Sequence, residues 1–183
     1  MGGLDARFLT ACLKDHTFKV RSVTTIATPH LGSPFASYLL YDVIGRKRLP
    51  TLLSLVQRLG IPGGGEAFEC LTTERMKEFN AYVPDQQGVS YYSWGAAFKP
   101  GLFNEFRFPH GIIWEKEGHN DGLVSVQSAQ WGKYQGTLAA THIEIIGWGN
   151  AIQQMLNWAG GETPFDTRDF YLMVCEDLAR DGM

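Results

Sequence analysis

The chain has 183 residues, of which 44% are hydrophobic and 19% are charged, and its formal net charge is −3. This length and composition are typical of one globular domain with its own core, and they exclude an intrinsically disordered chain. The sequence has no basic cluster, so we expect no nucleic-acid partner. No apolar run approaches the roughly 20 residues that a transmembrane helix needs.

The first half of the chain alternates between helical and strand patterns. Apolar residues within 2–14 share one helical face, and the β-branched run 18–27 predicts a buried strand that ends at a Thr-Pro turn. A helix followed directly by such a strand is typical of an α/β sheet. Short helices are expected within 35–59 and 67–82, with a glycine loop between them.

The second half of the chain continues the alternation. We expect strands at 89–96, 112–114 and 136–140, a long loop at 97–111, helical spacing in the second half of 143–158, and a helix at 167–179. Phe170, Met173, Val174 and Leu178 form the apolar stripe of the last helix. There is no internal repeat and no interdomain linker.

Three cysteines, Cys12, Cys70 and Cys175, lie far apart in the sequence. An odd number at these spacings forms neither a disulfide framework nor a CxxC metal pair. We therefore expect buried free thiols, which favour a reducing compartment.

Residues 1–7 read Met-Gly-Gly-Leu-Asp-Ala-Arg, which is similar to the second half of the G-x-S-x-G nucleophile elbow. On this reading Met1 follows the nucleophilic serine, which is expected just before Met1 and is absent from these residues. The backbone N–H of the residue after the nucleophile is an oxyanion donor, so Met1 would fill that position. As a chain terminus Met1 carries an amine instead, and the oxyanion hole would be incomplete.

No other residue is a good candidate nucleophile. The 183 residues contain no complete G-x-S-x-G. Ser93 has a tyrosine where the first glycine must be, Ser33 lacks both flanking glycines, and Cys12 lies within a predicted helix. The elbow is a strained turn that needs small neighbours, so we expect none of the three to act.

Asp121 and His142 are the candidate acid and base. In serine hydrolases with this elbow the chain order is Ser, then Asp or Glu, then His, each in a loop after a sheet strand. Asp121 follows the expected strand 112–114, and His142 follows the expected strand 136–140. His142 would take the serine proton and Asp121 would orient the imidazole. Two other interpretations remain: Asn-Asp-Gly is a turn sequence in itself, and His142 could simply begin a helix.

A metal or cofactor site is the competing chemistry. Four residues could in principle surround zinc: His110, His119, Asp121 and His142. No HExxH or clustered ligand spacing supports that site, and the glycines at 63–65 lack a phosphate-loop context. We therefore expect neither a metal nor a cofactor.

Several segments in the same order resemble triacylglycerol lipases of the α/β-hydrolase superfamily, of the fungal lipase 2 type. They are residues 1–7, 25–33, 61–65 with 68–73, 114–124 and 142–146, and they include Thr-Pro-His-Leu-Gly-Ser and Asn-Asp-Gly-Leu-Val. The resemblance implies an α/β-hydrolase fold that is truncated to its C-terminal part, one partial domain over residues 1–183. Parallel strands with flanking helices and a lid-like helical insertion at about 35–65 are then expected.

The resemblance also implies function. Asp121 would be the triad acid, His142 the base and Met1 an oxyanion donor, in a carboxylic ester hydrolase acting on triacylglycerol. The expected partner is a lipid ester substrate at a lipid–water interface. Because the serine is missing, we expect this chain to be inactive alone. A non-catalytic pseudoenzyme or a lipid- or partner-binding fragment is the alternative, and an acyltransferase on the same scaffold is a third. The fungal relatives include mitochondrial members, which favours a mitochondrial or cytoplasmic location.

Overall fold

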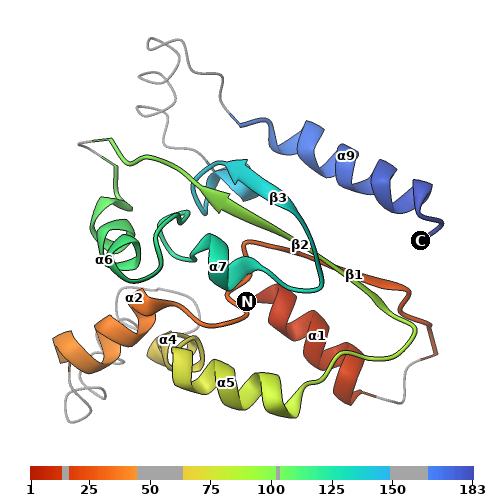
Figure 1. Cartoon of the computed structure of the whole chain (residues 1–183), viewed down its shortest axis with the longest axis horizontal. Coiled ribbons are helices and arrows are strands. Elements are labelled where there is room, and N and C mark those ends of the chain that lie inside the picture. The colour runs from red at the N-terminus through yellow and green to blue at the C-terminus, as the bar shows by residue number, and fades with distance from the viewer. Residues whose placement is uncertain (14–16, 45–63, 102–103, 149–164) are drawn as a thin grey trace.

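The structure is a computed structural model that describes residues 1–13, 17–44, 64–101, 104–148 and 165–183. Its centre is a parallel sheet with the strand order β1-β2-β3 (Figure 1). The strands are β1 (Ser22–Ile26), β2 (Ser90–Ala97) and β3 (Lys133–Ala139). β2 pairs in parallel with both neighbours, so its carboxyl end lies beside those of β1 and β3.

Helices cover both faces of the sheet and precede or follow each strand (Figure 1). They are α1 (Gly2–Cys12), α2 (Pro34–Tyr38), α4 (Gly64–Cys70), α5 (Thr73–Tyr82), α6 (Arg107–Glu117), α7 (Val126–Ala129) and α9 (Thr167–Arg180). A π-helical turn spans Leu39–Ile44 and a 3-10 turn spans Glu144–Ile146. Parallel strands with flanking helices confirm the expected α/β class.

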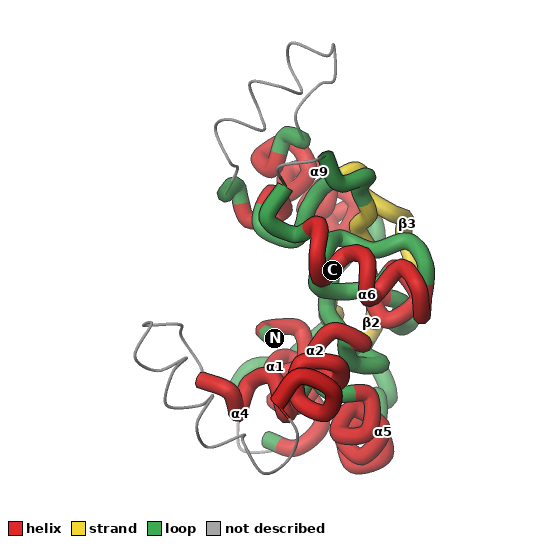
Figure 2. Tube along the Cα trace, turned by 90° about the vertical axis from the view of Figure 1, so that its left-hand side faces the viewer, coloured by secondary structure: helices red, strands yellow, loops and turns green. Residues whose placement is uncertain are grey.

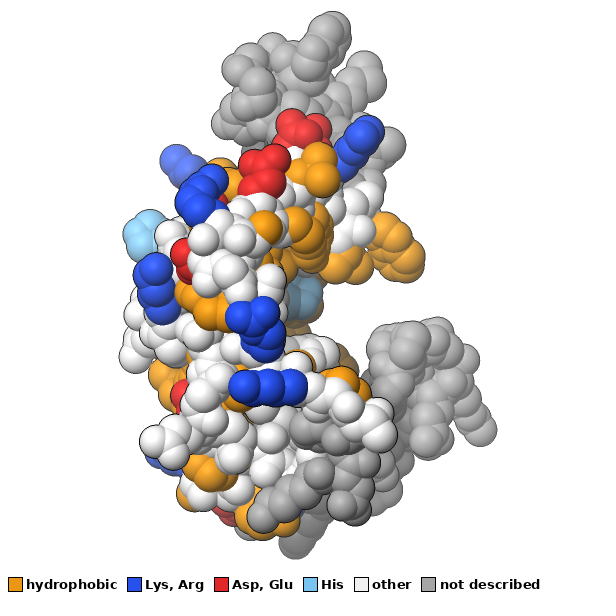
Figure 3. All heavy atoms as spheres, turned by 90° about the vertical axis from the view of Figure 1, so that its right-hand side faces the viewer, with side chains coloured by type: hydrophobic (Ala, Val, Ile, Leu, Met, Phe, Trp, Pro, Cys, Tyr) orange, Lys and Arg blue, Asp and Glu red, His pale blue; other side chains and the backbone are white. Residues whose placement is uncertain are grey.

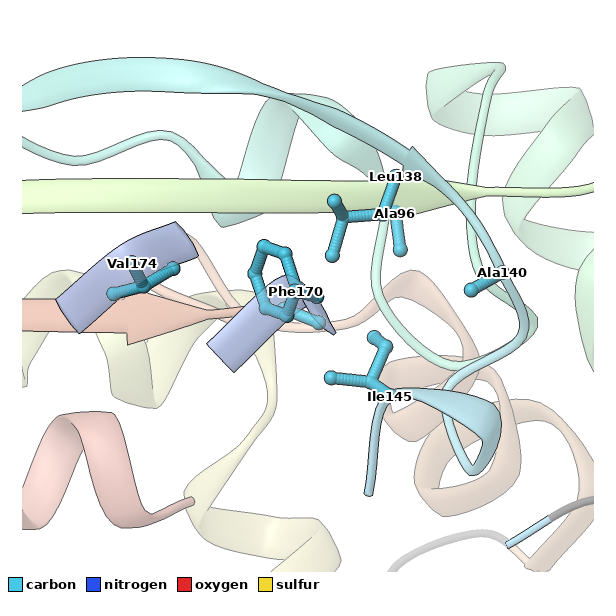
Figure 4. Close-up of a cluster of buried hydrophobic side chains, with 7 residues drawn as sticks. Ala96, Leu138, Ala140, Ile145, Phe170 and Val174 are labelled. Atoms are coloured by element: carbon cyan, nitrogen blue, oxygen red, sulfur yellow. The ribbon is translucent and has the colours of Figure 1, made fainter. Parts of the chain in front are cut away.

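Helix α9 covers one face of the sheet and completes the hydrophobic core. The core includes Ala96 of β2, Leu138 of β3, and Phe170 and Val174 of α9 (Figure 4). The ring of Phe170 meets that of Trp94 edge-on, with centroids 5.4 Å apart. The predicted helix is therefore confirmed, but Met173 of its predicted stripe is 37% exposed.

Helices α1 and α7 lie on the other face. The close approach of α1 to the end of β1 requires a glycine, because a Cβ on Gly3 would lie 2.3 Å from Thr28 Oγ1. On the neighbouring strand a Cβ on Gly95 would lie 2.6 Å from Tyr134 Oη. Gly3 therefore sets how closely α1 packs on the sheet, and Gly95 leaves room for the Tyr134 side chain of β3.

The predicted strand at 112–114 is wrong, because these residues lie in helix α6. The predicted loop at 97–111 is wrong in its last part for the same reason. Pro109 and Gly111 suggested a loop, but Pro109 lies in the first helical turn, where no backbone N–H is needed. Pro109, His110 and Ile113 are the buried residues of α6, a helical spacing.

Other expectations hold in part. The strand predicted at 18–27 is shorter, at Ser22–Ile26, and the helix predicted at 2–14 ends at Cys12, so that cysteine is terminal rather than central. The 3-10 turn stands at the start of the segment 143–158, of which 149–158 lie outside the described residues. Of the lid-like segment 35–65, residues 45–63 also lie outside them.

The cysteines are free, as expected, but the expectation that they are buried is wrong. Cys70 and Cys175 are exposed and Cys12 is partly buried. Cys175 follows the buried Val174 on α9, and the adjacent helical position turns its side chain away from the core.

The described chain has the outline of a C around a hollow (Figures 2 and 3). One limb carries α9 and the other carries α1, α2, α4 and α5, and the N-terminus faces the hollow (Figure 2). Hydrophobic side chains gather on the wall formed by the α9 limb (Figure 3). Among the described residues no helix is long and apolar enough to span a membrane.

Candidate active site

Asp121 and His142 are in direct contact. His142 Nδ1 lies 2.7 Å from Asp121 Oδ2, and the backbone N–H of His142 donates to the backbone carbonyl of Asp121 at 3.0 Å. The Asp121 side chain is fully buried, whereas 32% of the His142 side chain is exposed. The structure therefore brings together two of the residues that the sequence analysis selected, 21 positions apart in the chain.

The second oxygen of Asp121 holds its own turn. Oδ1 accepts hydrogen bonds from the backbone N–H groups of Leu123, at 2.9 Å, and Val124, at 2.7 Å. Gly122, between Asp121 and Leu123 in the sequence, has a φ of 99°, a left-handed conformation that favours glycine. These bonds fix the carboxylate so that Oδ2 points at the imidazole.

Asn120 anchors the same turn to two neighbouring elements. Its Nδ2 donates to the carbonyls of Gly118, at 2.8 Å, and His110, at 3.2 Å. Its backbone carbonyl accepts from the N–H of Phe98, at 3.2 Å, immediately after β2. Asp121 thus follows helix α6 in sequence, but a hydrogen bond connects its turn to the carboxyl end of β2. His142 follows β3.

This geometry suits general acid–base chemistry. Because Nδ1–H donates to a carboxylate, Nε2 of the neutral ring is left without a proton. No described residue forms a hydrogen bond with His142 Nε2. A partly exposed imidazole that is oriented by a buried carboxylate can accept a proton from a nucleophile and return it to a leaving group.

The three alternative nucleophiles lie elsewhere in the described chain. Ser33 Oγ donates to the Leu123 carbonyl at 2.7 Å, and the fully buried Ser93 Oγ accepts from Trp131 N–H at 2.8 Å. Cys12 is the last residue of α1. None of them is hydrogen-bonded to His142.

Met1 directly precedes helix α1. The N-terminal end of this helix lies at the edge of the sheet that holds the carboxyl ends of the strands (Figure 1). Its carbonyl accepts the first helical hydrogen bonds, from Leu4 N–H at 2.8 Å and Asp5 N–H at 3.2 Å. The helix therefore begins directly after Met1, as a helix following an elbow does.

The remaining metal candidates do not gather around the dyad. His110 Nε2 donates to the Phe98 carbonyl at 3.1 Å, and the His110 ring stacks on Trp114. The His119 ring meets the other side of this cluster, edge-on to Trp114 at 5.1 Å. Within the described ranges no three His, Cys, Asp or Glu side chains could hold a metal ion together.

Sequence reasoning missed a buried polar network centred on Arg7. The Arg7 side chain is 1% exposed and donates to His30 Nδ1 at 3.1 Å, Asn80 Oδ1 at 2.9 Å and the Val83 carbonyl at 3.2 Å. Its guanidinium lies 3.5 Å from the centroid of the Trp131 ring. Arg7 stands on the apolar face of α1, and an arginine among apolar helical positions was the available signal.

His30 is locked as a neutral ring in this network. Arg7 can only donate, so Nδ1 accepts and Nε2–H donates to Thr25 Oγ1, 2.9 Å away. Burial, reinforced by the charge of Arg7, lowers the pKa of His30 to about 3. The ring stays uncharged at neutral pH.

The network reaches the acid loop through the segment after β1. His30 N–H donates to the Ser128 carbonyl at 2.9 Å, and Ser128 Oγ donates to the Gly32 carbonyl at 2.6 Å. Ser33 adds its bond to Leu123. Residues 28–33 thus connect α1 with the segment that holds Asp121.

The chain is similar to known proteins in sequence and in fold. The chain is 37% identical to triacylglycerol lipase 2 of Saccharomyces cerevisiae over 194 aligned positions, which cover 100% of the chain and 56% of that protein. The chain therefore spans about half the length of this curated relative. No family model matches the chain.

Two solved structures show the same fold. The Staphylococcus hyicus lipase matches with a TM-score of 0.66 and 16% identity, over 98% of this chain and 68% of that chain. A Bacillus licheniformis lipase in its mature form matches with a TM-score of 0.61 and 24% identity, over 79% of this chain and 56% of that chain.

Proposed function

Because the chain belongs to the lipases of the α/β-hydrolase fold, we propose that it carries the acid and base of a serine ester hydrolase for triacylglycerol. The contact of 2.7 Å between Asp121 Oδ2 and His142 Nδ1 carries this proposal. The name of the yeast relative supports the substrate class.

The proposed reaction uses His142 twice. A serine that directly precedes Met1 in a longer polypeptide attacks the ester carbonyl while His142 Nε2 takes its proton. His142 then returns the proton to the departing alcohol, which leaves an acyl-enzyme. In the second half His142 activates water, and Asp121 stabilises the imidazolium in both steps. The peptide N–H of Met1 donates to the oxyanion in such a polypeptide.

We propose that residues 1–183 alone do not hydrolyse esters. No described serine or cysteine is hydrogen-bonded to His142, and Met1 as a terminus has no peptide N–H to offer. The segment of about 35–65 is proposed as the lid that covers the site away from a lipid–water interface. Its described part contains apolar residues of α2 and the π-helical turn, such as Leu39 and Leu40.

The alternative is a non-catalytic protein that binds lipid or a partner. The lack of a nucleophile beside His142 in the described chain favours it. The coding sequence upstream of Met1 separates the two proposals. An in-frame Gly-x-Ser directly before Met1 supports the hydrolase, and its absence supports the pseudoenzyme.

Labelling with a fluorophosphonate tests the hydrolase proposal. The 183-residue chain should remain unlabelled, and a longer polypeptide that contains the serine should be labelled and should cleave a chromogenic ester. In that polypeptide Asp121→Asn should lower kcat by about 10⁴-fold, because the wrong imidazole tautomer is then favoured. Asp177→Asn is the matched control, since Asp177 is exposed on α9 and pairs with Arg180.

Two results would overturn the proposal. Covalent labelling of the 183-residue chain would show a nucleophile that we have not recognised. Full ester hydrolysis by Asp121→Asn in the longer polypeptide would remove Asp121 from the mechanism.

A further inference from the structure

A pocket of about 780 Å³ lies where helix α6 meets the carboxyl ends of β2 and β3. Neither Asp121 nor His142 is among the described residues that line it, although His119, two positions before Asp121, is one of them. Its volume falls in the range of about 300–1,000 Å³ that is typical of small-molecule sites. We call it the α6 pocket.

Aromatic rings in fixed positions form one wall of the α6 pocket. The rings of His110 and Trp114 stack at 5.8 Å with an interplanar angle of 16°, and the ring of Phe98 meets His110 edge-on at 5.2 Å. His110 is 7% exposed, and its burial lowers its pKa, so the ring is neutral. Trp114, in contrast, is 50% exposed and presents a large apolar surface to the pocket.

The charges on the lining are of one sign. Lys99 and Arg107 are the charged side chains among the described residues that line the pocket, and no described carboxylate lines it. Apolar walls next to two cations are complementary to an amphiphile that has an acyl chain and an anionic head. A neutral ester would use the walls and leave the cations without a partner.

We propose that the α6 pocket binds one long-chain fatty acid, with the chain against Phe98 and Trp114 and the carboxylate at Lys99 and Arg107. The choice of a fatty acid rests on the proposed function, since ester hydrolysis releases this acid. The volume fits a single chain better than a phospholipid with two chains and a head group.

The bound acid would lie against the residues that hold the acid loop. Asn120 Nδ2 donates to the His110 carbonyl at 3.2 Å, and Phe98 N–H donates to the Asn120 carbonyl at 3.2 Å. Both His110 and Phe98 line the pocket, and Asn120 precedes Asp121. The pocket and the loop that holds Asp121 therefore share two supporting residues, His110 and Phe98.

Quenching of tryptophan fluorescence by a brominated fatty acid tests the proposal on the full 183-residue chain. Below its micelle concentration, dibromostearic acid should quench the emission saturably. Trp114→Phe should remove most of that quenching, because phenylalanine keeps an aromatic wall but contributes no tryptophan emission. The chain has five tryptophans, so this variant assigns the signal to the pocket.

The cations are tested with variants and with the uncharged ligand. The double variant Lys99→Gln and Arg107→Gln should weaken binding of the acid by about tenfold or more, as expected for losing hydrogen bonds to a charged group. Lys116→Gln, an exposed position of α6 outside the pocket, should bind as the unchanged chain does. Dibromostearic methyl ester should bind the unchanged chain no better than the acid binds the double variant.

Equal binding of the acid and its methyl ester, or quenching that survives Trp114→Phe, would overturn the proposal. Tighter binding of a lysophosphatidic acid than of the fatty acid would overturn the choice of ligand. No readout depends on ester cleavage. A failure here therefore leaves the proposed hydrolase unaffected, and an inactive enzyme could still bind the fatty acid.

Discussion

Asp121 has two roles, one for each carboxylate oxygen. The sequence left a turn residue and a triad acid as competing interpretations, and the structure contains the turn bonds together with a contact to His142. Oδ1 accepts two backbone N–H groups of its own turn, and Oδ2 faces His142 Nδ1. The turn chemistry is thus what orients the carboxylate toward the imidazole.

His30 makes the stability of the chain depend on pH. Its pKa is about 3 in the folded chain and about 6.5 in the unfolded chain, so between these values the unfolded chain binds a proton that the folded chain does not. This contribution is fully present above pH 6.5 and is lost as the pH falls toward 3. The free energy of unfolding should drop by up to about 1.4 kcal/mol per pH unit in that window.

Urea denaturation between pH 5 and pH 6.5 measures this slope. His30→Asn keeps an acceptor near Arg7 and lacks the titrating ring, so its slope should be shallower than that of the unchanged chain. His119→Asn removes an exposed histidine and should leave the slope as it is. An unchanged slope in His30→Asn would contradict the prediction.

At the scale of the element, α1 can pack closely on the sheet because Gly3 has no side chain. A Cβ there would lie 2.3 Å from Thr28 Oγ1 and 2.9 Å from Thr25 Cγ2. Gly3→Ala should therefore lower the free energy of unfolding by about 1–3 kcal/mol through overpacking. Gly2→Ala is the matched control, since nothing lies within 4 Å of its Cβ and alanine favours helix. Equal urea midpoints for the two variants would refute this account.

Helix α9 is held by Phe170. Its side chain is 5% exposed in the core and contacts Trp94 edge-on. Phe170→Ala should cost about 3–5 kcal/mol in the free energy of unfolding. Met173→Ala, on the exposed side of the same helix, should cost far less in the same thermal or urea measurement. A loss at Met173 as large as that at Phe170 would show that the predicted stripe was right after all.

At the scale of the whole molecule, β1 has an open edge in the described sheet. β1 pairs with β2 on one side, and no other described strand pairs with it. The Arg21 carbonyl accepts from Ser90 N–H, and Ala27 N–H donates to the Trp94 carbonyl. Backbone groups of alternate residues point to opposite edges, so those of Thr24 point away from β2. An edge of this kind is a template for pairing with another chain.

The 183-residue chain should therefore self-associate as its concentration rises. Thr24→Pro removes a donor from the open edge and keeps the ladder with β2, and the Thr24 hydroxyl is buried without a partner in any case. Sedimentation velocity should show less association of this variant at equal concentration, with an unchanged circular dichroism spectrum. A sedimentation coefficient of the unchanged chain that does not vary with concentration would contradict this.

The sequence alone determined the features that local chemistry controls. β-branched and aromatic runs predicted β1 and β2, and the amphipathic pattern predicted α9. The Asn-Asp-Gly turn and His142 were selected as candidates for the site. It failed at α6, where Pro109 and Gly111 suggested a loop although a proline in the first helical turn costs little.

Only the tertiary structure decided the contacts between distant segments. The pairing of Asp121 with His142, the buried Arg7–His30 network and the α6 pocket each join segments that no local pattern connects. A buried arginine or a neutral histidine is recognisable once its neighbours from other elements are in place, because burial and partners set its charge and role. Residue types thus indicated the chemistry, and packing decided which residues meet.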